Sequence, residues 1–259
     1  MSRIVVLHIP HSSRHIPTEL RRAICLDDAE LQKELLRMTD AYTDELFPVT
    51  PVEAARVVFP ISRLICDVER FPSDDSEPMA SRGMGVIYTR TSNGDILRAQ
   101  PDAATRQSLL DRWYWPHHSQ LERMVNHIVM RSGICLIVDC HSFPSVALSY
   151  ELDQTGQRAD FCVGTDSFHT PSFVRDVIVT AVSEAGYSVA VDTPFSGALV
   201  PLTYYHKDRR IFSVMIEVNR GIYMNEHSGL ANQEFERVRS TVGQLIVAAA
   251  EAANPQPAD

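Results

Sequence analysis

"GICLIVDCHSFPS", residues 133–145, is the stretch that decides the fold. Ile134–Val138 are apolar without polar alternation, which is typical of a strand covered on both faces of a sheet. The run is followed at once by Asp139, Cys140, His141 and Ser142. In open α/β sheets, ligands bind beyond the carboxyl ends of the strands. The stretch therefore predicts a buried strand that carries polar side chains to a site, although a polar strand end can also be only a turn.

Strand-like runs recur along the chain and alternate with segments of helical periodicity. Strands are expected at Ile4–His8, Arg56–Pro60, Leu64–Val68, Gly85–Tyr88, Cys135–Asp139, Phe161–Gly164, Ser188–Val191 and Val214–Val218. Helices are expected at 27–47, at 103–130 as two helices or one kinked at Pro116, at 171–187 and at 233–252. This alternation predicts an α/β fold, a three-layer sandwich around a central mixed, mostly parallel sheet. Because no repeat or linker divides the sequence, residues 1–259 are interpreted as one domain.

The composition narrows the class of partner. The 259 residues are 44% hydrophobic and 22% charged, which suits a globular protein with a full core. A net charge of -9 argues against nucleic acid or an anionic membrane as partner, but a few arginines can still hold a small anionic substrate. The five cysteines form no CxxC pair, and no segment reads as a signal peptide or a membrane span. We therefore expect a cytoplasmic protein without a disulfide framework.

Polar side chains on three predicted strands could converge on one site. His11 follows the first strand, His141 follows the "LIVD" run, and Glu217 lies among apolar residues in the last strand. Two histidines and a carboxylate are the usual protein ligands of a catalytic zinc, which lowers the pKa of its bound water to about 7. Glu217 is suited to accept the proton of that water. The alternative is structural, with histidines in turns and Glu217 paired with Arg220.

Two further groups of charged residues are candidates for ligand contacts. Asp40 and Asp44 are four residues apart and are expected on one face of the 27–47 helix, as metal ligands or as a solvated surface. Arg63 and Arg70 flank Asp67 in "SRLICDVERF". Arginine recognises carboxylates through paired hydrogen bonds, so this segment could bind an anionic substrate. An Asp67–Arg70 salt bridge that fixes the loop is the alternative.

Seven motifs in order resemble a known family. They are "PHSSRHIP", "TDAYTDELF", "SRLICDVERF", "GMGVIYTR", "DCHSFPS", "DFCVGT" and "IEVNRGIYMNE". Together they resemble the N-formylglutamate amidohydrolase family, from about residue 7 to residue 227. That family is similar in fold and site layout to the zinc carboxypeptidases and aspartoacylases. The resemblance therefore implies a zinc carboxypeptidase-like (phosphorylase/hydrolase-like) fold.

The resemblance also implies roles for individual residues. His11 and His141 match zinc ligands, and Glu217 matches the general base or acid. "DVER" occupies the place of a "DLNR"-like motif whose arginine holds the substrate's carboxylate, so Arg70 is expected to bind the substrate. Arg63 and Arg220 are further candidates for that role.

Two positions depart from the pattern. Glu69 stands where the related motif has asparagine, which adds a negative charge beside an anionic substrate. Arg14 stands where carboxypeptidases have a glutamate ligand, so the third zinc ligand must come from elsewhere. The "TDAYTDELF" segment is the expected donor, with Asp40 as the ligand and Asp44 as its substitute.

The function implied is that of a zinc-dependent amidohydrolase. Its expected substrate is N-formyl-L-glutamate, cleaved to L-glutamate and formate, in the context of histidine degradation. Glu69 keeps open a carboxypeptidase- or deacylase-like hydrolase of another N-acyl amino acid or peptide. A metal-free binding protein on the same fold is the alternative from another class.

Overall fold

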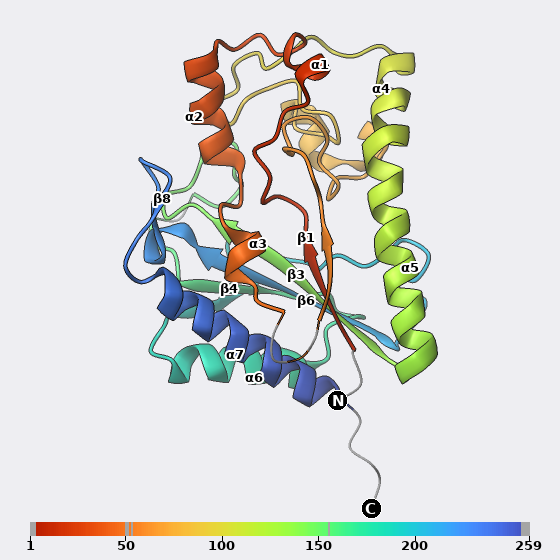
Figure 1. The fold of residues 1–259 in the computed structure, drawn as a ribbon, viewed down its shortest axis with the longest axis vertical. Coiled ribbons are helices and arrows are strands. Elements are labelled where there is room, and N and C mark those ends of the chain that lie inside the picture. The colour runs from red at the N-terminus through yellow and green to blue at the C-terminus, as the bar shows by residue number, and fades with distance from the viewer. Residues whose placement is uncertain (1–3, 50–51, 53, 155, 255–259) are drawn as a thin grey trace, which may run out of the picture.

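The centre of the molecule is a six-stranded sheet with strand order β2-β1-β3-β6-β4-β5 (Figure 1). The computed structural model describes residues 4–49, 52, 54–154 and 156–254. Strands β1, β2, β3 and β6 are parallel, β4 is antiparallel to β6, and β5 is parallel to β4. Their bounds are β1 Val5–Ile9, β2 Ala55–Val58, β3 Cys135–Phe143, β4 Phe161–Gly164, β5 Val189–Val191 and β6 Ile211–Asn219. The prediction of a mixed, mostly parallel sheet is confirmed.

Helices cover both faces of this sheet. The α-helices are α1 Thr18–Arg21, α2 Asp28–Met38, α3 Thr43–Leu46, α4 Ala103–Leu109, α5 Trp115–Ser132, α6 Ser172–Glu184 and α7 Phe235–Ala253. The long helix α5 lies on one side of the sheet, and α6 and α7 lie together on the other (Figure 1). Short 3-10 turns at Asp74–Ser76, Pro78–Arg82 and Arg220–Ile222, and a small hairpin of β7 (Met224–Asn225) and β8 (Leu230–Ala231), complete the fold. The predicted three-layer sandwich is therefore confirmed.

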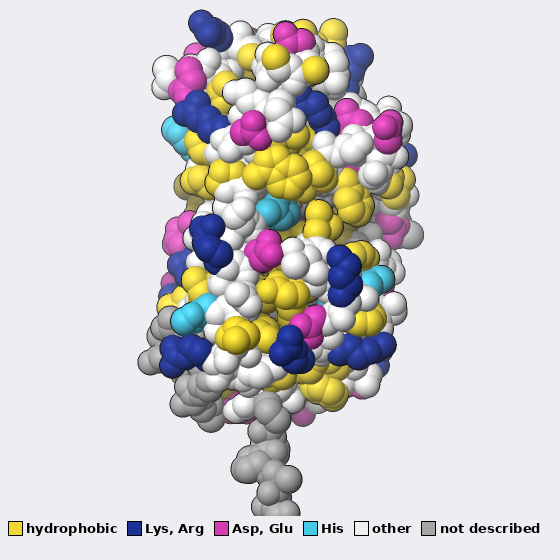
Figure 2. All heavy atoms as spheres, turned by 90° about the vertical axis from the view of Figure 1, so that its right-hand side faces the viewer, with side chains coloured by type: hydrophobic (Ala, Val, Ile, Leu, Met, Phe, Trp, Pro, Cys, Tyr) yellow, Lys and Arg dark blue, Asp and Glu magenta, His cyan; other side chains and the backbone are white. Residues whose placement is uncertain are grey.

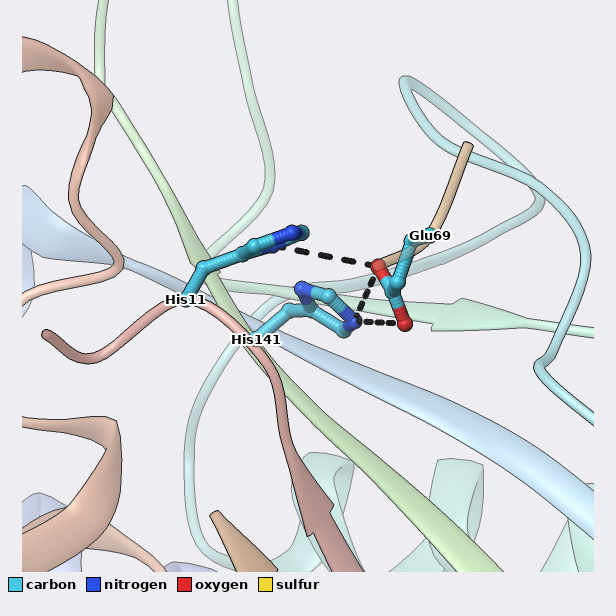
Figure 3. Close-up of side chains that lie close together, drawn as sticks. All are labelled: His11, Glu69 and His141. Atoms are coloured by element: carbon cyan, nitrogen blue, oxygen red, sulfur yellow. Dashed lines mark hydrogen bonds and ion pairs between the residues drawn. The ribbon is translucent and has the colours of Figure 1, made fainter. Parts of the chain in front are cut away.

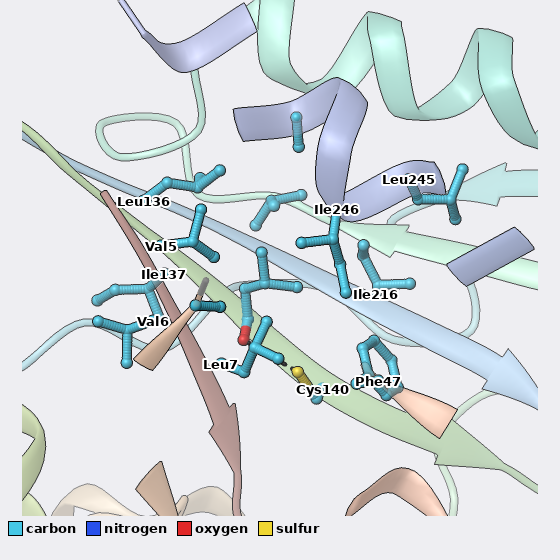
Figure 4. Close-up of a cluster of buried hydrophobic side chains, with 14 of the residues drawn as sticks. Val5, Val6, Leu7, Phe47, Leu136, Ile137, Cys140, Ile216, Leu245 and Ile246 are labelled. Carbon is cyan, nitrogen blue, oxygen red and sulfur yellow. Dashed lines mark hydrogen bonds between the residues drawn. The ribbon is translucent and has the colours of Figure 1, made fainter. Parts of the chain in front are cut away.

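The central strands are largely apolar because both of their faces are buried. All nine residues of β3 are buried, and they pair in register with β6 from Cys135↔Ile211 to Phe143↔Asn219. On the face towards α7, Leu245 and Ile246 lie close to side chains of the sheet (Figure 4). Burial of each such aliphatic side chain stabilises the fold by about 1.5–3 kcal/mol. The "LIVD" run thus forms the expected strand, but the strand continues past Asp139 to Phe143.

The predicted helix over 27–47 is wrong, because it is broken in the middle. Helix α2 begins with a capping box between Asp27 and Glu30, and it ends at Met38. The backbone N–H of Asp40 then donates to the carbonyl of His11 at 3.0 Å, and Tyr42 adopts a left-handed φ of 66° before α3 begins. Asp40 and Asp44 consequently do not share a helix face. Asp40 is buried, whereas Asp44 is exposed on α3.

Two predicted strands, Leu64–Val68 and Gly85–Tyr88, are also wrong. Both segments are turns and loops, joined where the backbone N–H of Asp67 donates to the carbonyl of Val86 at 2.8 Å. Their apolar side chains pack with α2 and α4 in a second hydrophobic cluster, separate from the one around the sheet. A short buried apolar run has the same periodicity whether it is a strand or a packed loop, which explains the error.

The expected long helix over 103–130 occurs as two helices in line. A π-helical turn, Leu110–Tyr114, joins α4 to α5. Pro116 lies in the first turn of α5, where a missing N–H costs little, so the irregular turn comes before the proline. On the face that carries α5, positive and negative side chains are interspersed with apolar ones (Figure 2). Among the described residues, no helix has the length and apolar content needed to cross a membrane.

Candidate active site

Strand register brings four polar side chains to one face of the sheet. His8 pairs with Asp139 across β1 and β3, and His141 pairs with Glu217 across β3 and β6. Asp139 and His141 are two residues apart on β3, so they point to the same side. All four residues lie towards the carboxyl ends of parallel strands, where ligand sites of such sheets are found. A cavity of about 540 Å³ opens there, and Asp139, His141 and Glu217 are among its lining residues.

His11 follows β1 and is oriented by Asp67. Its Nε2 donates to Oδ1 of Asp67 at 2.9 Å. The other oxygen of Asp67 accepts from Arg63 at 2.8 and 3.1 Å and from the hydroxyl of Tyr88 at 2.6 Å. Burial alone would raise the pKa of Asp67, but Arg63 and then His11 hold it well below its usual range. A carboxylate that stays ionised fixes the proton of neutral His11 on Nε2 and leaves the lone pair on Nδ1.

The Nδ1 atom of His11 is buried and has no hydrogen-bond partner among the described residues. Oδ2 of Asp40 lies 3.6 Å from it and Oε2 of Glu69 lies 3.8 Å from it. These distances are too long for hydrogen bonds. They are close to the separation of about 3.3 Å that two ligand atoms have when each is about 2.0 Å from a tetrahedral zinc. A buried nitrogen with two carboxylates at this spacing fits a metal ion.

His141 has a carboxylate at each ring nitrogen. Its Nδ1 is 2.9 Å from Oδ2 of Asp40, and its Nε2 is 3.1 Å from Oε2 of Glu69 and 3.3 Å from Oδ1 of Asp139. Burial lowers the pKa of His141, but Glu69, Asp139 and Asp40 together raise it well above its ordinary value. The metal-free site therefore holds a proton on His141 that a metal ion would displace.

Two sets of ligands are candidates. Coordination through Nδ1 of His141 would use His11, Asp40 and His141, the set expected from the sequence, but this set is not among the described groups whose ligand atoms all lie within 4.8 Å of one another. Coordination through Nε2 uses His11, Glu69 and His141, whose ligand atoms all lie within 4.8 Å of one another (Figure 3). A neighbouring group of His8, Glu69 and Asp139 meets the same spacing. In either set, the remaining carboxylate lies against the other nitrogen of His141 and orients the ring.

Asp40 is more buried than Glu69. Its backbone N–H donates a hydrogen bond to the carbonyl of His11. Its Oδ1 lies 3.5 Å from Nη2 of Arg220 and 3.7 Å from Nη1 of Arg63. Burial would raise the pKa of Asp40, but His11 and His141 hold it well below its usual range. Glu69 is more open, since 14% of its side chain is exposed, against 4% for Asp40. Asp44, the substitute ligand, is exposed and is not among the described residues that line the cavity.

Glu217 is a buried carboxyl group beside the histidines. Its Oε2 has no hydrogen-bond partner among the described residues. Burial raises the pKa of Glu217 to about 8, although His141 and Arg220 partly oppose this rise. A carboxyl group that can both hold and release a proton near neutral pH is suited to general acid–base chemistry.

The three predicted substrate-binding arginines all line the cavity, but they differ in how strongly the protein engages them. Arg63 forms a two-nitrogen contact to Asp67. The Nη1 of Arg220 donates to the carbonyl of Arg37 at 2.6 Å and its Nη2 to the carbonyl of Ser142 at 3.2 Å. Arg70 is more open, and its Nε is 3.9 Å from Oδ2 of Asp67. The proposed Asp67–Arg70 pair is thus long, and Arg63 is the closer partner of Asp67.

Sequence reasoning missed several residues of the site. Asp67 was interpreted as a partner of Arg70 rather than of His11, and Glu69 as a group beside the substrate only. Asp139 and the fully buried His8, joined at 2.7 Å, were not singled out as a pair. A polar residue inside an apolar strand was the available signal for both, because burial of such a group requires a partner.

Comparison with known proteins adds to this geometry. The sequence pattern of the N-formylglutamate amidohydrolase family matches residues 3–224. The crystal structure of N-formylglutamate amidohydrolase from Ralstonia eutropha JMP134 has a TM-score of 0.82 and 22% identity, and the match covers 97% of this chain and 93% of that chain. For gene product Atu2144 from Agrobacterium tumefaciens the TM-score is 0.65 with 18% identity, and 95% and 91% of the two chains are covered. No curated protein sequence matches the chain. At these identities the structural likeness establishes the fold.

Proposed function

The chain belongs to the N-formylglutamate amidohydrolase family, as its seven motifs predicted, and from this membership we propose a zinc-dependent hydrolysis of N-acyl amino acids. N-formyl-L-glutamate is the reference substrate, and its products would be L-glutamate and formate. The observation that carries the zinc dependence is the buried Nδ1 of His11, which has no hydrogen-bond partner in the described part of the chain and has carboxylate oxygens at 3.6 and 3.8 Å.

His11, Asp40 and His141 are the proposed ligands, and Glu69 is the competing third ligand. Asp40 is favoured because its Oδ2 lies 3.6 Å from Nδ1 of His11 and 2.9 Å from Nδ1 of His141. Its backbone N–H also donates to the carbonyl of His11. When bound there, zinc would polarise the acyl oxygen and make a bound water a better nucleophile. Asp67 keeps Nδ1 of His11 free for the metal by accepting the proton of Nε2.

Glu217 is the proposed proton carrier of the reaction. In hydrolysis, the oxygen of water bonds to the acyl carbon, the carbon–nitrogen bond breaks, and the amine nitrogen gains a proton. The carboxylate of Glu217 would accept the proton from the attacking water and then deliver it to the leaving amine. Its burial and raised pKa support both steps, because a carboxyl group with a pKa near neutral pH can both accept and donate a proton.

Two measurements test this proposal. Metal analysis of protein purified without added zinc should find close to one bound zinc per chain. The same preparation should hydrolyse at least one member of a panel of N-formyl and N-acyl amino acids, with chelation abolishing turnover and added zinc restoring it. Bound zinc with release of a terminal residue from peptides, but no action on the panel, would favour the carboxypeptidase-like alternative. Protein that neither binds zinc nor hydrolyses any of these compounds would be the metal-free binding protein.

A further inference from the structure

The cavity offers few positive charges for a substrate with two carboxylates. Three arginines, Arg63, Arg70 and Arg220, are among its described lining residues, and the histidines there are His118 and the two proposed metal ligands, His11 and His141. N-formylglutamate has an α-carboxylate and a side-chain carboxylate, and burial of each requires a partner of opposite charge. How many of these arginines are available therefore limits how many carboxylates the cavity can hold.

Arg220 is committed to the protein. Only 5% of its side chain is exposed, and each of its three nitrogens has a protein partner. The Nη1 and Nη2 atoms donate to the carbonyls of Arg37 and Ser142, and Nε lies 3.4 Å from the hydroxyl of Ser142. The Oδ1 of Asp40 lies 3.5 Å from Nη2 as well. These contacts already engage all three nitrogens, and burial limits the access of a substrate carboxylate to this guanidinium.

Arg63 is largely committed too. Its Nε and Nη2 both donate to Oδ2 of Asp67, and its Nη1 lies 3.7 Å from Oδ1 of Asp40. Two ionised carboxylates therefore already balance its single charge. Because Asp67 orients His11, releasing Arg63 to a substrate would also disturb the proposed metal site.

Among the described residues that line the cavity, Arg70 is the most open arginine. Its side chain is 20% exposed, the largest exposed fraction of the three, and its buried Nε has no hydrogen-bond partner among the described residues. The nearest acidic oxygens, on Asp67 and Glu77, are 3.9 and 4.0 Å away. Beside it in the chain, the carboxylate of Glu69 lines the same cavity and would repel a second negative charge. The cavity is thus suited to one substrate carboxylate rather than two.

Much of the rest of the cavity wall is apolar, although Glu151 and Asp153 also line it. Inside it are aromatic and aliphatic side chains, including Tyr114, Phe143, Phe195 and Met215. At its edge lie large apolar side chains that are exposed to solvent: Phe71, Leu152, Leu202 and Tyr205. Exposed apolar side chains around one cavity indicate a binding surface, because removing them from water is favourable. An apolar group of the substrate would bury them.

We propose that the substrate is an N-acyl amino acid with a single carboxylate, which is held by Arg70. The side chain of this amino acid is apolar and packs against the exposed apolar residues at the edge of the cavity, which include Phe71 and Leu202. This inference rests on the proposed hydrolysis of N-acyl amino acids and specifies its substrate class. It departs from N-formylglutamate because the other two arginines among the described lining residues already contact protein groups, and because Glu69 would repel a second carboxylate.

The experiment compares four substrates on the zinc-loaded protein: N-formyl-L-leucine, N-formyl-L-methionine, N-formyl-L-phenylalanine and N-formyl-L-glutamate. We expect kcat/KM for the best apolar substrate to exceed that for N-formylglutamate by at least tenfold. An equal or higher value for N-formylglutamate would overturn this inference and leave the proposed function standing. Hydrolysis of none of the four, nor of the corresponding N-acetyl compounds, would overturn the proposed function and this inference with it.

Two variants locate the contact. Leu202→Ser and Phe71→Ser should each lower kcat/KM for N-formylphenylalanine at least threefold and leave the value for N-formylglutamate nearly unchanged. Met130→Ser is the matched control, since Met130 is an exposed apolar side chain on α5 that is not among the described residues lining the cavity. Equal losses on both substrates, or no loss on either, would overturn the proposed apolar contact.

Discussion

His141 and Glu217 are register partners on the adjacent parallel strands β3 and β6. Their side chains therefore project from the same face of the sheet, although they come from distant parts of the sequence. Burial raises the pKa of Glu217 to about 8, and the imidazole of His141 partly opposes this rise. The sheet thus places a candidate metal ligand beside a candidate proton carrier, and the pairing of two strands determines how these groups influence each other.

Removal of either histidine ligand should abolish metal binding. We expect His11→Ala and His141→Ala to lower the zinc content at least tenfold, because two remaining protein ligands hold zinc poorly. His15→Ala is the control, since His15 belongs to the same motif but is exposed. Metal analysis by mass spectrometry gives the result, and full occupancy in either variant would exclude that residue as a ligand.

The third ligand can be identified by comparing two carboxylates. Asp40→Asn should lower the zinc content strongly, whereas Glu69→Gln should retain most of the metal. Asp44→Asn serves as the control, because Asp44 is exposed on α3. The reverse pattern for Asp40 and Glu69 would show that the metal is bound through Nε2 of His141 rather than through its Nδ1.

Glu217→Gln should separate metal binding from catalysis. The amide keeps the shape of the side chain but cannot carry the proton, so we expect kcat to fall by about 10²–10⁴. The zinc content should stay close to that of the unchanged protein. Turnover within a few-fold of normal would make Glu217 a structural residue and would remove it from the proposed mechanism.

The same substitution should change how the stability of the metal-free protein depends on pH. The pKa of Glu217 is about 8 when folded, against 4.5 as its ordinary value, so the folded state binds the proton more tightly. The stability that this proton provides is fully present below about pH 4.5 and is lost as the pH rises through about 8. Glu217→Gln should therefore raise Tm at pH 9 by roughly 2–8 °C, corresponding to about 1–2 kcal/mol, with little effect at pH 4.5.

Calorimetry in the presence of a chelator measures this difference. Glu184→Gln is a matched control, because Glu184 is an exposed glutamate at the end of α6. A Tm difference that is the same at pH 4.5 and pH 9 would contradict the assignment, since it would not follow the ionisation of Glu217.

Arg70→Ala should weaken substrate binding without loss of metal. A charge-assisted contact between guanidinium and carboxylate is worth a few kcal/mol when it is buried, so KM should rise by roughly 10- to 100-fold. Arg70→Lys should restore binding only in part, because lysine lacks the paired donors. Arg112→Ala, at an exposed arginine, is the control. An unchanged KM in Arg70→Ala would show that the substrate carboxylate binds elsewhere.

Several elements could be predicted because their signals are local. Strands β1, β3, β4 and β6 each contain a largely apolar run, since both faces of the sheet are covered there, and these runs indicated the strands. The helices α6 and α7 follow from their periodicity. The family followed from seven short motifs in a fixed order, which the matching pattern over residues 3–224 confirms.

Other elements depended on contacts that no local pattern contains. The end of α2 before Asp40 was missed because the backbone N–H of Asp40 donates to the carbonyl of His11, which lies far from it in the sequence. The segment Leu64–Val68 was misread because its apolar residues pack in the second hydrophobic cluster rather than in the sheet.

The sequence by itself determined the main strands of the sheet, the helices α6 and α7 and the family, and it supplied candidates for the site residues, because burial and periodicity act over a few neighbouring residues. Only the tertiary structure decided that Asp67 fixes the tautomer of His11, and that Asp40 and Glu69 lie at opposite nitrogens of His141. It alone also decided that Arg70 is the most open of the three arginines among the described residues that line the cavity. These relationships depend on strand register and on loops that meet at the end of the sheet, and distances of a few ångströms between distant residues are not encoded in any local pattern.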